Sequence, residues 1–228
     1  MANSMNSATL DEQTIKILIV DDHPLVRQGL ELLINQRSGW SVSGHAGSTA
    51  EALQQLVADK PDLVLVDVSL QDGSGLELLK EVKARDPEIR MLVLSNHDES
   101  VYAERALRAG ASGYINKLEA GDKLLEAIEE VLKGKIALSR KMTERMVARA
   151  VGGGSDVRTA QPIEALSDRE LEVFELIGRG LTTRQIASKL FLSPKTVETY
   201  RESIKTKLEL ANSTQLVRTA VRWVLEGA

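Results

Sequence analysis

Three aspartates come directly after runs of aliphatic residues, where a carboxylate is unexpected. Asp21 and Asp22 follow IKILIV (15–20), and Asp67 follows DLVLV (62–66). Aspartate is disfavoured in buried strands, so each carboxylate either opens a turn or lies at the rim of a sheet to do chemistry. Three carboxylates that converge repel one another and need a cation, and hard oxygen ligands suit Mg²⁺. Jointly they predict a Mg²⁺ site; taken singly, each is equally well explained by a turn or a helix cap.

Two further polar residues follow apolar runs in the same way. Ser95 comes after IRMLVL (89–94), and Lys117 comes after SGYIN (112–116). A hydroxyl and an ammonium group beside Mg²⁺ are what neutralises the oxygens of a phosphoryl group during transfer. Alone, Ser95 is more typical of a turn and Lys117 of a surface lysine whose stem covers apolar groups. Five polar residues at four predicted strand ends favour a site for phosphoryl chemistry.

The elements that would bring these side chains together are five short apolar runs, each followed by an amphipathic stretch. The runs are residues 15–20, 40–46, 62–66, 89–94 and 112–116. Strands that alternate with helices, and are aliphatic without interruption, predict a doubly wound, five-stranded, mainly parallel sheet. Ligands bind such sheets in a crevice at the carboxyl ends of the strands. If the first and third strands are neighbours, the three aspartates share one crevice.

The second half of the chain changes character. SRKMTERMVARA (139–150) predicts a short helix, and the glycine-rich, polar stretch that follows predicts a flexible linker. The remaining pattern is helical, with four segments that each begin with Ser, Thr or Asn at the N-cap position. We therefore expect a small all-α domain after the α/β domain. The expected divisions are a disordered tail (1–14), the α/β domain (15–133), a linker with a short helix (134–161) and the all-α domain (162–228).

Two of the later segments have the pattern of a helix-turn-helix. In TTRQIASKLFLSPKTVETYRESIKTKL the first helix turns Ile186, Ala187 and Leu190 inward, and Ser193 caps the second. The inner face of the second helix is Val197, Ile204 and Leu208, and its outer face is Lys195, Glu198, Thr199, Glu202 and Lys205. An apolar back and a polar, partly basic front suit a recognition helix in the major groove of DNA. The alternative is an ordinary helical domain whose charged face is solvated.

Composition limits the classes of protein that fit. Residues 1–139 carry 14 Lys+Arg against 22 Asp+Glu, whereas residues 184–207 carry six basic and two acidic side chains, which suggests different partners for the two halves. The chain has no cysteine, so disulfides, thiolate metal sites and cysteine catalysis are excluded. The polar start has no apolar signal region, and no segment has the length of a membrane span. We expect a cytoplasmic protein with no membrane partner.

Residues 15–133 resemble a response-regulator receiver domain, which is flavodoxin-like, and residues 162–228 resemble the LuxR-type helix-turn-helix domain of the NarL/FixJ branch. The resemblance rests on the strand-end aspartates, SN (95–96), GYINK (113–117) and LSDRELEVFELIGRGLTTRQIASKLFLSPKTVETY. It implies a two-component transcription regulator that is not a turnover enzyme and receives a phosphoryl group from a sensor histidine kinase.

The resemblance also assigns roles to residues of the receiver. Asp67 is the phospho-acceptor by this likeness, and Mg²⁺ is held by Asp21, Asp22, Asp67 and the backbone carbonyl of Ser69. Ser95 would be the switch hydroxyl, Lys117 the lysine that pairs with the phosphoryl group, and Tyr114 the aromatic residue that rotates. Gly75 matches the glycine eight residues after the acceptor.

In the second domain, the resemblance implies binding to double-stranded DNA as a homodimer. Base edges would be read by Glu198, Thr199 and Glu202, and phosphates would be contacted by Lys195, Thr196, Arg201, Lys205 and Lys207. A glutamate can accept from cytosine but repels phosphate. The helix expected at 212–225 has more apolar residues than four helices bury, so we expect it to pair with a second copy.

Two departures from the family pattern affect the acceptor loops. Gln71 and Leu118 stand where receivers often have proline, and without proline we expect a trans bond between Lys117 and Leu118.

A phosphatase of the haloacid dehalogenase type would need an aspartate where Ser69 stands, and a nucleotide site would need a glycine-rich loop. His97 is more typical of an exposed loop than of a functional group. The alternative function is a receiver-like module that signals by protein interaction without phosphotransfer.

Overall fold

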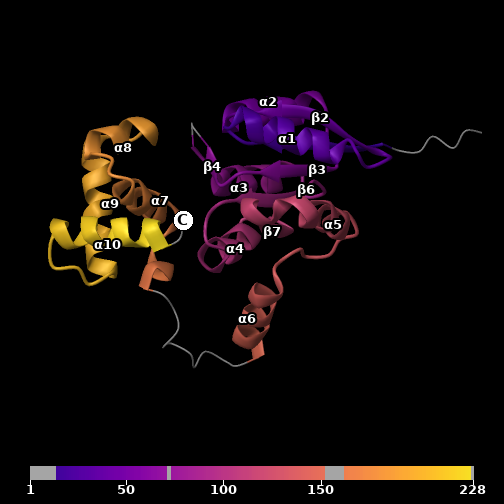
Figure 1. Ribbon diagram of the computed structural model, residues 1–228. Helices are drawn as coiled ribbons and strands as arrows, with labels where there is room; N and C mark the ends of the chain where they lie inside the picture. The colour runs from indigo at the N-terminus through magenta and orange to yellow at the C-terminus, as the bar shows by residue number, and fades with distance from the viewer. Residues whose placement is uncertain (1–13, 71–72, 152–161, 227–228) are drawn as a thin grey trace, which may run out of the picture.

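The computed structural model describes residues 14–70, 73–151 and 162–226, and Figure 1 shows a sheet covered by helices followed by a separate group of helices. Five parallel strands make the sheet, in the order β2-β1-β3-β6-β7. These strands are β1 (Ile15–Val20), β2 (Trp40–Ala46), β3 (Leu63–Val66), β6 (Arg90–Ser95) and β7 (Gly113–Asn116). The expected doubly wound, five-stranded parallel sheet followed by an all-α helix-turn-helix domain is confirmed.

The register of the two central strands decides where the aspartates lie. In β1 and β3, Val20 pairs with Val66, so the residues that follow them, Asp21 and Asp67, emerge side by side. The Asp67 N–H donates to the carbonyl of Val20 at 2.8 Å and extends the ladder by one bond. The condition that the first and third strands are neighbours is therefore met.

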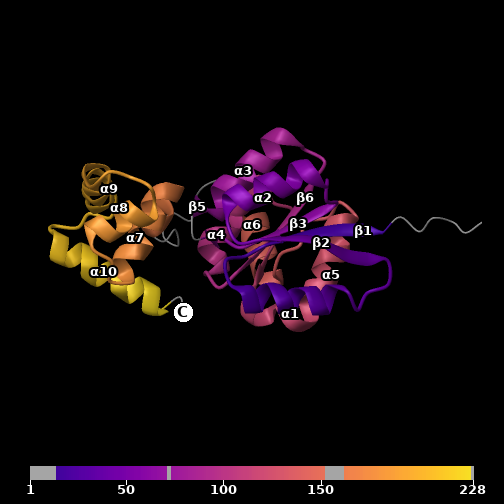
Figure 2. The same ribbon diagram turned by 90° about the horizontal axis from the view of Figure 1, so that it is seen from above.

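Helices cover both faces of the sheet (Figure 2). One face packs against α1 (Pro24–Ile34) and α5 (Ala120–Leu132), and the other against α2 (Thr49–Ala58), α3 (Gly75–Arg85) and α4 (Glu99–Arg108). Residues along each strand point to alternate faces, so Ile17 and Ile19 join the first layer while Leu18 and Val20 join the second. Each strand is thus buried on both sides, as its uninterrupted aliphatic run predicts.

Short elements shape the loops at the carboxyl edge. A short antiparallel pair of two-residue strands, β4 (Ser69–Leu70) and β5 (Gly73–Ser74), follows β3. A 3-10 turn, η1 (Lys117–Glu119), follows β7. The sequence predicted only a turn into the next helix at the first of these places. Gln71 lies outside the described residues. Every described peptide bond is trans, so the expected trans bond between Lys117 and Leu118 is confirmed.

The second group of helices begins with the 3-10 turn η2 (Pro162–Ala165) and continues with α7 (Asp168–Gly178), α8 (Thr183–Lys189), α9 (Pro194–Lys207) and α10 (Ser213–Glu226). The predicted N-caps are confirmed for all four helices, since Ser167, Thr182, Ser193 and Asn212 each accept a backbone N–H from the first turn of their helix. Gly178 lets α7 and α10 approach closely, because a Cβ there would lie 2.4 Å from the carbonyl oxygen of Ala220.

One further helix, α6 (Arg140–Val151), lies where the sequence predicted a short helix. Arg149 donates to Glu104 of α4 at 2.6 Å and to Glu164 of η2 at 2.7 Å. Arg145 donates to the carbonyl of Ser100 at 3.1 Å and also pairs with Glu164. The helix therefore joins the first domain to the start of the second. No helix in the described part of the chain is long and apolar enough to cross a membrane. The expected tail falls mostly on residues 1–13, outside the described residues.

Candidate functional site

The carboxyl edge of the sheet gathers the three predicted aspartates. Ligand atoms of Asp21, Asp22, His23 and Asp67 all lie within 4.8 Å of one another. Asp21 and Asp67 are only 2% and 5% exposed, so two of the carboxylates are held out of water. Burial of several carboxylates is costly unless cations compensate them. The cluster is therefore an arrangement that stability alone does not explain.

Lys117 supplies the cation that the structure does contain. Its Nζ lies 2.6 Å from Asp21 Oδ2 and 2.7 Å from Asp67 Oδ2, and the side chain is 11% exposed. Burial opposes charge on the ammonium, but the Coulomb attraction of Asp67 and the bonds to both carboxylates outweigh it, so the pKa of Lys117 is raised. The lysine therefore stays charged and bridges the two strand ends.

Asp67 is in an environment suited to reaction. Burial raises the pKa of the Asp67 carboxyl above its ordinary value, although Lys117 acts in the opposite direction. Its Oδ1 accepts the N–H of Ser69 at 3.3 Å, and its Oδ2 accepts from Lys117. A buried, oriented carboxylate can act as a nucleophile. The neighbouring ammonium group can stabilise negative charge on the group that the carboxylate attacks.

The acidic residues fit a divalent cation. Asp22 Oδ1 is buried and has no hydrogen-bond partner, although His23 Nδ1 lies 2.6 Å from it. An unsatisfied carboxylate oxygen beside two further carboxylates is the donor set that a hard cation requires. An acidic cluster suited to a cation is thus present at the predicted place.

The predicted switch residues lie one strand further along the sheet. Ser95 ends β6 and is fully buried, and its Oγ accepts the N–H of His97 at 3.3 Å. Tyr114 is buried in β7, and its hydroxyl donates to the carbonyl of His97 at 2.8 Å. Burial raises the pKa of Tyr114, with a hydrogen bond to Ser95 acting the other way. The two residues therefore meet at the His97 backbone.

His97 is the residue that sequence reasoning placed wrongly. Its side chain is only 12% exposed, where an exposed loop was expected. The ring stacks on Tyr102 with centroids 4.5 Å apart, and Nε2 lies 2.7 Å from Ser69 Oγ. Burial lowers the pKa of His97, so the ring is neutral at physiological pH. Its position two residues after Ser95 was the available signal, but the burial depends on a helix of the second domain.

Gly75 is required for close packing against the acceptor strand. A Cβ at this position would lie 2.0 Å from the Asp67 carbonyl oxygen and 2.8 Å from Val68 Cα. Backbone atoms cannot yield as a flexible side chain can, so the first residue of α3 must be glycine for the acceptor loop to keep this conformation.

The predicted DNA-reading face lies on α9. Val197 and Ile204 are buried, as expected, and Leu208 is half-buried. On the outer side Lys195, Glu198, Thr199 and Glu202 are exposed, whereas Thr196, Arg201 and Lys205 are half-buried. Figure 1 shows α9 on the side of its domain away from the sheet. The outer face is therefore accessible.

Several predicted DNA contacts already have partners within the protein. Thr183 Oγ1 donates to Glu198 at 2.6 Å, and Lys205 pairs with Glu202 at 2.9 Å. Lys207 lies 2.6 Å from Glu170, a buried carboxylate at the start of α7. Lys207 therefore has a structural role that its place in a basic segment did not reveal. Arg184 and Lys189 of α8 are further exposed cations that sequence reasoning left out of the DNA contacts, and Lys189 lines a hollow shared with Asp22 and Ser69 of the first domain.

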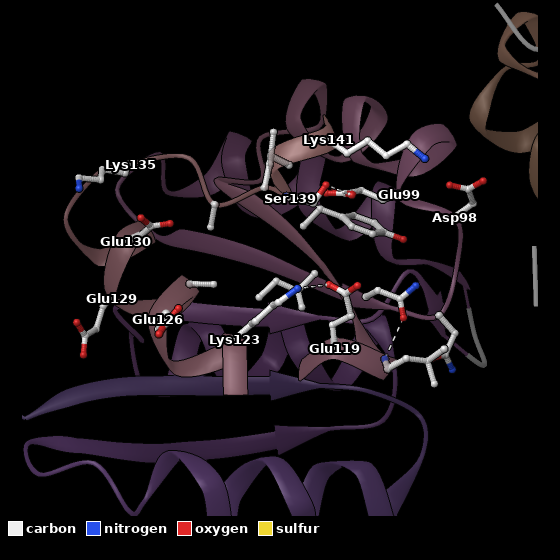
Figure 3. A pocket seen from close by; sticks show the side chains of 18 of the residues that line it. Asp98, Glu99, Glu119, Lys123, Glu126, Glu129, Glu130, Lys135, Ser139 and Lys141 are labelled. Atoms are coloured by element: carbon white, nitrogen blue, oxygen red, sulfur yellow. Dashed lines mark hydrogen bonds and ion pairs between the residues drawn. The ribbon is translucent and has the colours of Figure 1, made fainter. Parts of the chain in front are cut away.

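A groove of about 850 Å³ lies elsewhere on the first domain, between α4, β7, α5 and residues 135–141. Figure 3 shows charged side chains around it, with Lys123 bonded to Glu119 and Ser139 bonded to Glu99. Of the residues that line the groove, Tyr114 is the one that was also predicted to belong to the phosphorylation site. The groove is therefore separate from the carboxylate cluster but shares one residue with the switch.

Family comparisons match the two domains separately. Residues 17–129 match the family model of the response regulator receiver domain. Residues 164–220 match that of the bacterial regulatory proteins of the luxR family. The oxygen regulatory protein NreC of Staphylococcus haemolyticus is 37% identical over 211 residues, which cover 91% of this chain and 97% of that protein. NreC of Staphylococcus aureus matches to the same extent.

Solved structures are similar as well. A two-component response regulator of the LuxR family from Aurantimonas sp. is 35% identical, with a TM-score of 0.57 over 60% of this chain and 99% of that one. RcsB from Salmonella typhimurium gives a TM-score of 0.71 at 24% identity and covers 92% of this chain and 98% of that one. RcsB from Salmonella enterica serovar Typhimurium bound to the promoter P1flhDC, with phosphomimetic BeF3−, gives 0.68 at 24% identity over 92% and 99% of the chains. At 24% identity, the similarity to RcsB shows only that the two proteins share a fold.

Proposed function

The chain belongs to the two-component response regulators that join a receiver to a LuxR-type DNA-binding domain, and from this premise we propose that Asp67 is its phospho-acceptor. The protein is a transcription regulator rather than a turnover enzyme. The observation that carries the proposal is the edge of the sheet where Asp21, Asp22, Asp67 and Lys117 meet.

Each group at this edge has a task in the transfer. A carboxylate oxygen of Asp67 attacks phosphorus while the P–N bond of a phosphohistidine on the sensor kinase breaks and the imidazole departs. Lys117 pairs with an oxygen of the incoming phosphoryl group. The Ser95 hydroxyl donates to another oxygen once Asp67 carries the group, and Tyr114 follows Ser95 into the space it leaves.

We propose that Asp21, Asp22, Asp67 and the backbone carbonyl of Ser69 hold Mg²⁺. The buried Asp22 Oδ1, which makes no hydrogen bond within the described residues, supports this assignment. The bound ion would supply positive charge that offsets the repulsion between phosphoryl oxygens and carboxylates. Lys117 now lies between Asp21 and Asp67, so we expect it to leave Asp21 and keep Asp67 when the ion is present.

For the second domain we propose sequence-specific binding to double-stranded DNA as a homodimer. Base edges are assigned to Glu198, Thr199 and Glu202, and phosphates to Lys195, Thr196, Arg201, Lys205 and Lys207. The exposed outer face of α9 supports this division. Val217 and Leu225 on α10 are exposed apolar side chains, which supports pairing of two copies through that helix. Because such a regulator has to reach both DNA and a sensor kinase, we place it in the cytoplasm. We place the end of the receiver at residue 133 and the start of the DNA-binding domain at residue 162.

The test of the phospho-acceptor is labelling by a small phosphodonor. With acetyl phosphate and Mg²⁺ we expect one acid-labile phosphoryl group per chain, and none on the Asp67→Asn variant. The matched control is Asp59→Asn, which changes an exposed aspartate paired with Lys16 and should label like the wild type. Asp22→Ala should raise the Mg²⁺ concentration needed for half-maximal labelling.

Two outcomes would overturn the assignment. Equal labelling of the wild type and Asp67→Asn would place the acceptor elsewhere. No labelling of the wild type, from acetyl phosphate or a phosphorylated kinase domain, would favour a receiver-like module that signals without phosphotransfer.

A further inference from the structure

The DNA-binding domain lies against the receiver close to the acceptor site. Asp168 of α7 accepts from Arg105 at 2.9 Å and from Lys80 at 2.8 Å. Two turns further along α7, Glu175 accepts from the hydroxyl of Tyr102 at 2.9 Å. A hollow of about 180 Å³ between the domains is lined by Asp22 and Ser69 from the receiver and by Glu175 from α7. The mouth of the carboxylate crevice therefore faces α7.

His97 is the side chain that connects the acceptor loop to this contact. Nε2 lies 2.7 Å from Ser69 Oγ, two residues after Asp67, and Nδ1 lies 3.5 Å from Glu175 Oε2. The same residue accepts from Tyr114 through its carbonyl and donates to Ser95 through its N–H. His97 thus contacts the acceptor loop, both predicted switch residues and the second domain.

The two ring nitrogens of His97 have different neighbours, which favours one position of the proton. A neutral imidazole has one N–H and one lone pair. The carboxylate of Glu175, 3.5 Å from Nδ1, attracts an N–H and repels a lone pair. The Ser69 hydroxyl can donate to Nε2 or accept from it, so Glu175 decides the balance. The contacts therefore favour the tautomer with hydrogen on Nδ1.

We propose that His97 is a positioning residue that couples phosphorylation to domain contact by exchanging its tautomer. The proposal rests on Asp67 being the phospho-acceptor. A phosphoryl group on Asp67 adds acceptor oxygens and negative charge beside Ser69. A hydrogen on Nε2 then becomes favourable, because it can donate towards those oxygens. Nδ1 would present a lone pair to Glu175, and the contact with α7 would become repulsive.

The coupling is reciprocal by thermodynamic necessity. If phosphorylation weakens the contact between Glu175 and His97, the contact must equally disfavour phosphorylation. Glu175 therefore acts at the acceptor site from the other domain. α9 lies on the side of its domain away from the sheet (Figure 1) and its outer side chains are already exposed. Domain separation therefore does not uncover the DNA-reading face; it frees the DNA-binding domain to pair with a second copy.

The first experiment observes the tautomer directly. Nitrogen chemical shifts of ¹⁵N-labelled histidine distinguish Nδ1–H from Nε2–H, and the chain has three histidines, so the His97→Phe variant assigns the signal. We expect Nδ1–H in the unphosphorylated full-length chain and Nε2–H after acetyl phosphate and Mg²⁺. A histidine that merely packs against Tyr102 would keep one tautomer in both states. Nε2–H before phosphorylation, or no change on phosphorylation, would overturn the proposal.

The second experiment measures domain separation. The chain has no native cysteine, so dyes can be attached at Gln54→Cys and Arg218→Cys, both exposed positions. We expect phosphorylation to lengthen the distance in the otherwise wild-type chain. His97→Phe retains the ring stack on Tyr102 but has no N–H, and here phosphorylation should no longer change the distance. An unchanged response in His97→Phe would show that the domains separate by another route.

The third measurement is the rate of labelling by acetyl phosphate. Glu175→Gln removes the charge that favours Nδ1–H, and we expect it to accelerate labelling about 5-fold or more, the lower end of common coupling between sites. The control is Glu144→Gln on α6, whose exposed carboxylate pairs with Arg140 and which should label like the wild type. Equal rates for Glu175→Gln and the control would contradict the coupling.

These results separate the inference from the proposed function. A wild-type chain that takes no phosphoryl group overturns both. A chain labelled on Asp67 whose tautomer, domain distance and Glu175→Gln rate stay unchanged overturns the inference and leaves the phospho-acceptor in place.

Discussion

Glu170 gives the sharpest prediction about the stability of the DNA-binding domain. Its carboxylate accepts from the N–H of Ser167 at 2.6 Å, from Ser203 at 2.5 Å and from Lys207 at 2.6 Å. Burial opposes the charged form, but these bonds outweigh it, and they lower the pKa of Glu170 from 4.5 to about 2. The residue thus ties the first turn of α7 to the last turns of α9.

The lowered pKa converts to a free energy of unfolding. One pKa unit corresponds to ~1.4 kcal/mol, so the drop of about 2.5 units amounts to up to ~3 kcal/mol at neutral pH. Glu170→Gln keeps a side chain that can complete the capping box but loses the charge, so we expect a loss of ~2–3 kcal/mol. Glu202→Gln is the control, because its exposed pair with Lys205 is worth under ~1 kcal/mol.

The sign of the pH dependence follows from the direction of the pKa shift. A carboxyl group whose pKa is lower in the folded state stabilises fully above its unfolded pKa of 4.5 and loses that contribution as pH falls towards 2. The difference between wild type and Glu170→Gln should therefore be constant above pH 6 and fall to about half, ~1.4 kcal/mol, at pH 3.

Urea unfolding followed by tryptophan fluorescence measures this difference. Trp223 lies in α10 with its ring 5.7 Å from that of Phe174, so its emission reports the second domain, and a Trp40→Phe background removes the other tryptophan of the chain. A loss below ~0.5 kcal/mol at pH 7 would refute the reasoning, since that is the usual effect of a surface substitution. A difference that stays constant down to pH 3 would refute the electrostatic cause.

Gly75→Ala should slow labelling of Asp67 at least about tenfold, because a Cβ 2.0 Å from the Asp67 carbonyl oxygen must displace the acceptor loop, and positioning errors of this kind cost about two orders of magnitude; a rate equal to that of the wild type would show that the loop accommodates the methyl group. Lys205→Ala should weaken binding to all DNA sequences alike and lower the slope of log affinity against log salt by about one. Glu198→Ala should instead change the ratio of specific to scrambled binding, by ~1–3 kcal/mol at one base position, and an unchanged ratio would remove Glu198 from the reading face. Two copies should protect half-sites about one helical turn, ~10 bp, apart in a footprint.

The residues at the strand ends could be predicted because a parallel sheet has simple geometry. An aliphatic run fixes where a strand ends, and neighbouring parallel strands bring those ends to one edge. Asp21 and Asp67 therefore meet once β1 and β3 pair, and Lys117 reaches both from β7. Only the strand order was missing from the sequence pattern, so the neighbouring first and third strands could be stated only as a condition.

The environment of His97 could not be predicted, because two domains create it. Its burial depends on Tyr102 of α4 and on Glu175 of α7, and no periodicity along the chain encodes which faces of two domains meet. The role of Lys207 was hidden for a related reason. A lysine in a basic segment predicts a DNA contact, whereas its bond to Glu170 depends on how α7 crosses α9. The N-cap pattern located Ser167 correctly but gave no sign that Glu170 joins α7 to α9.

Ten residues of chain connect Val151 of α6 to Pro162 of η2. The bond between Arg149 and Glu164 joins the two ends of this connection. Contact between the domains is therefore a unimolecular equilibrium, with an effective concentration that a short tether sets in the millimolar range. Interactions too weak to join the separated domains suffice to hold them together in one chain, and dilution cannot dissociate them. Operator DNA or a second copy therefore has to compete with a neighbour that is always present.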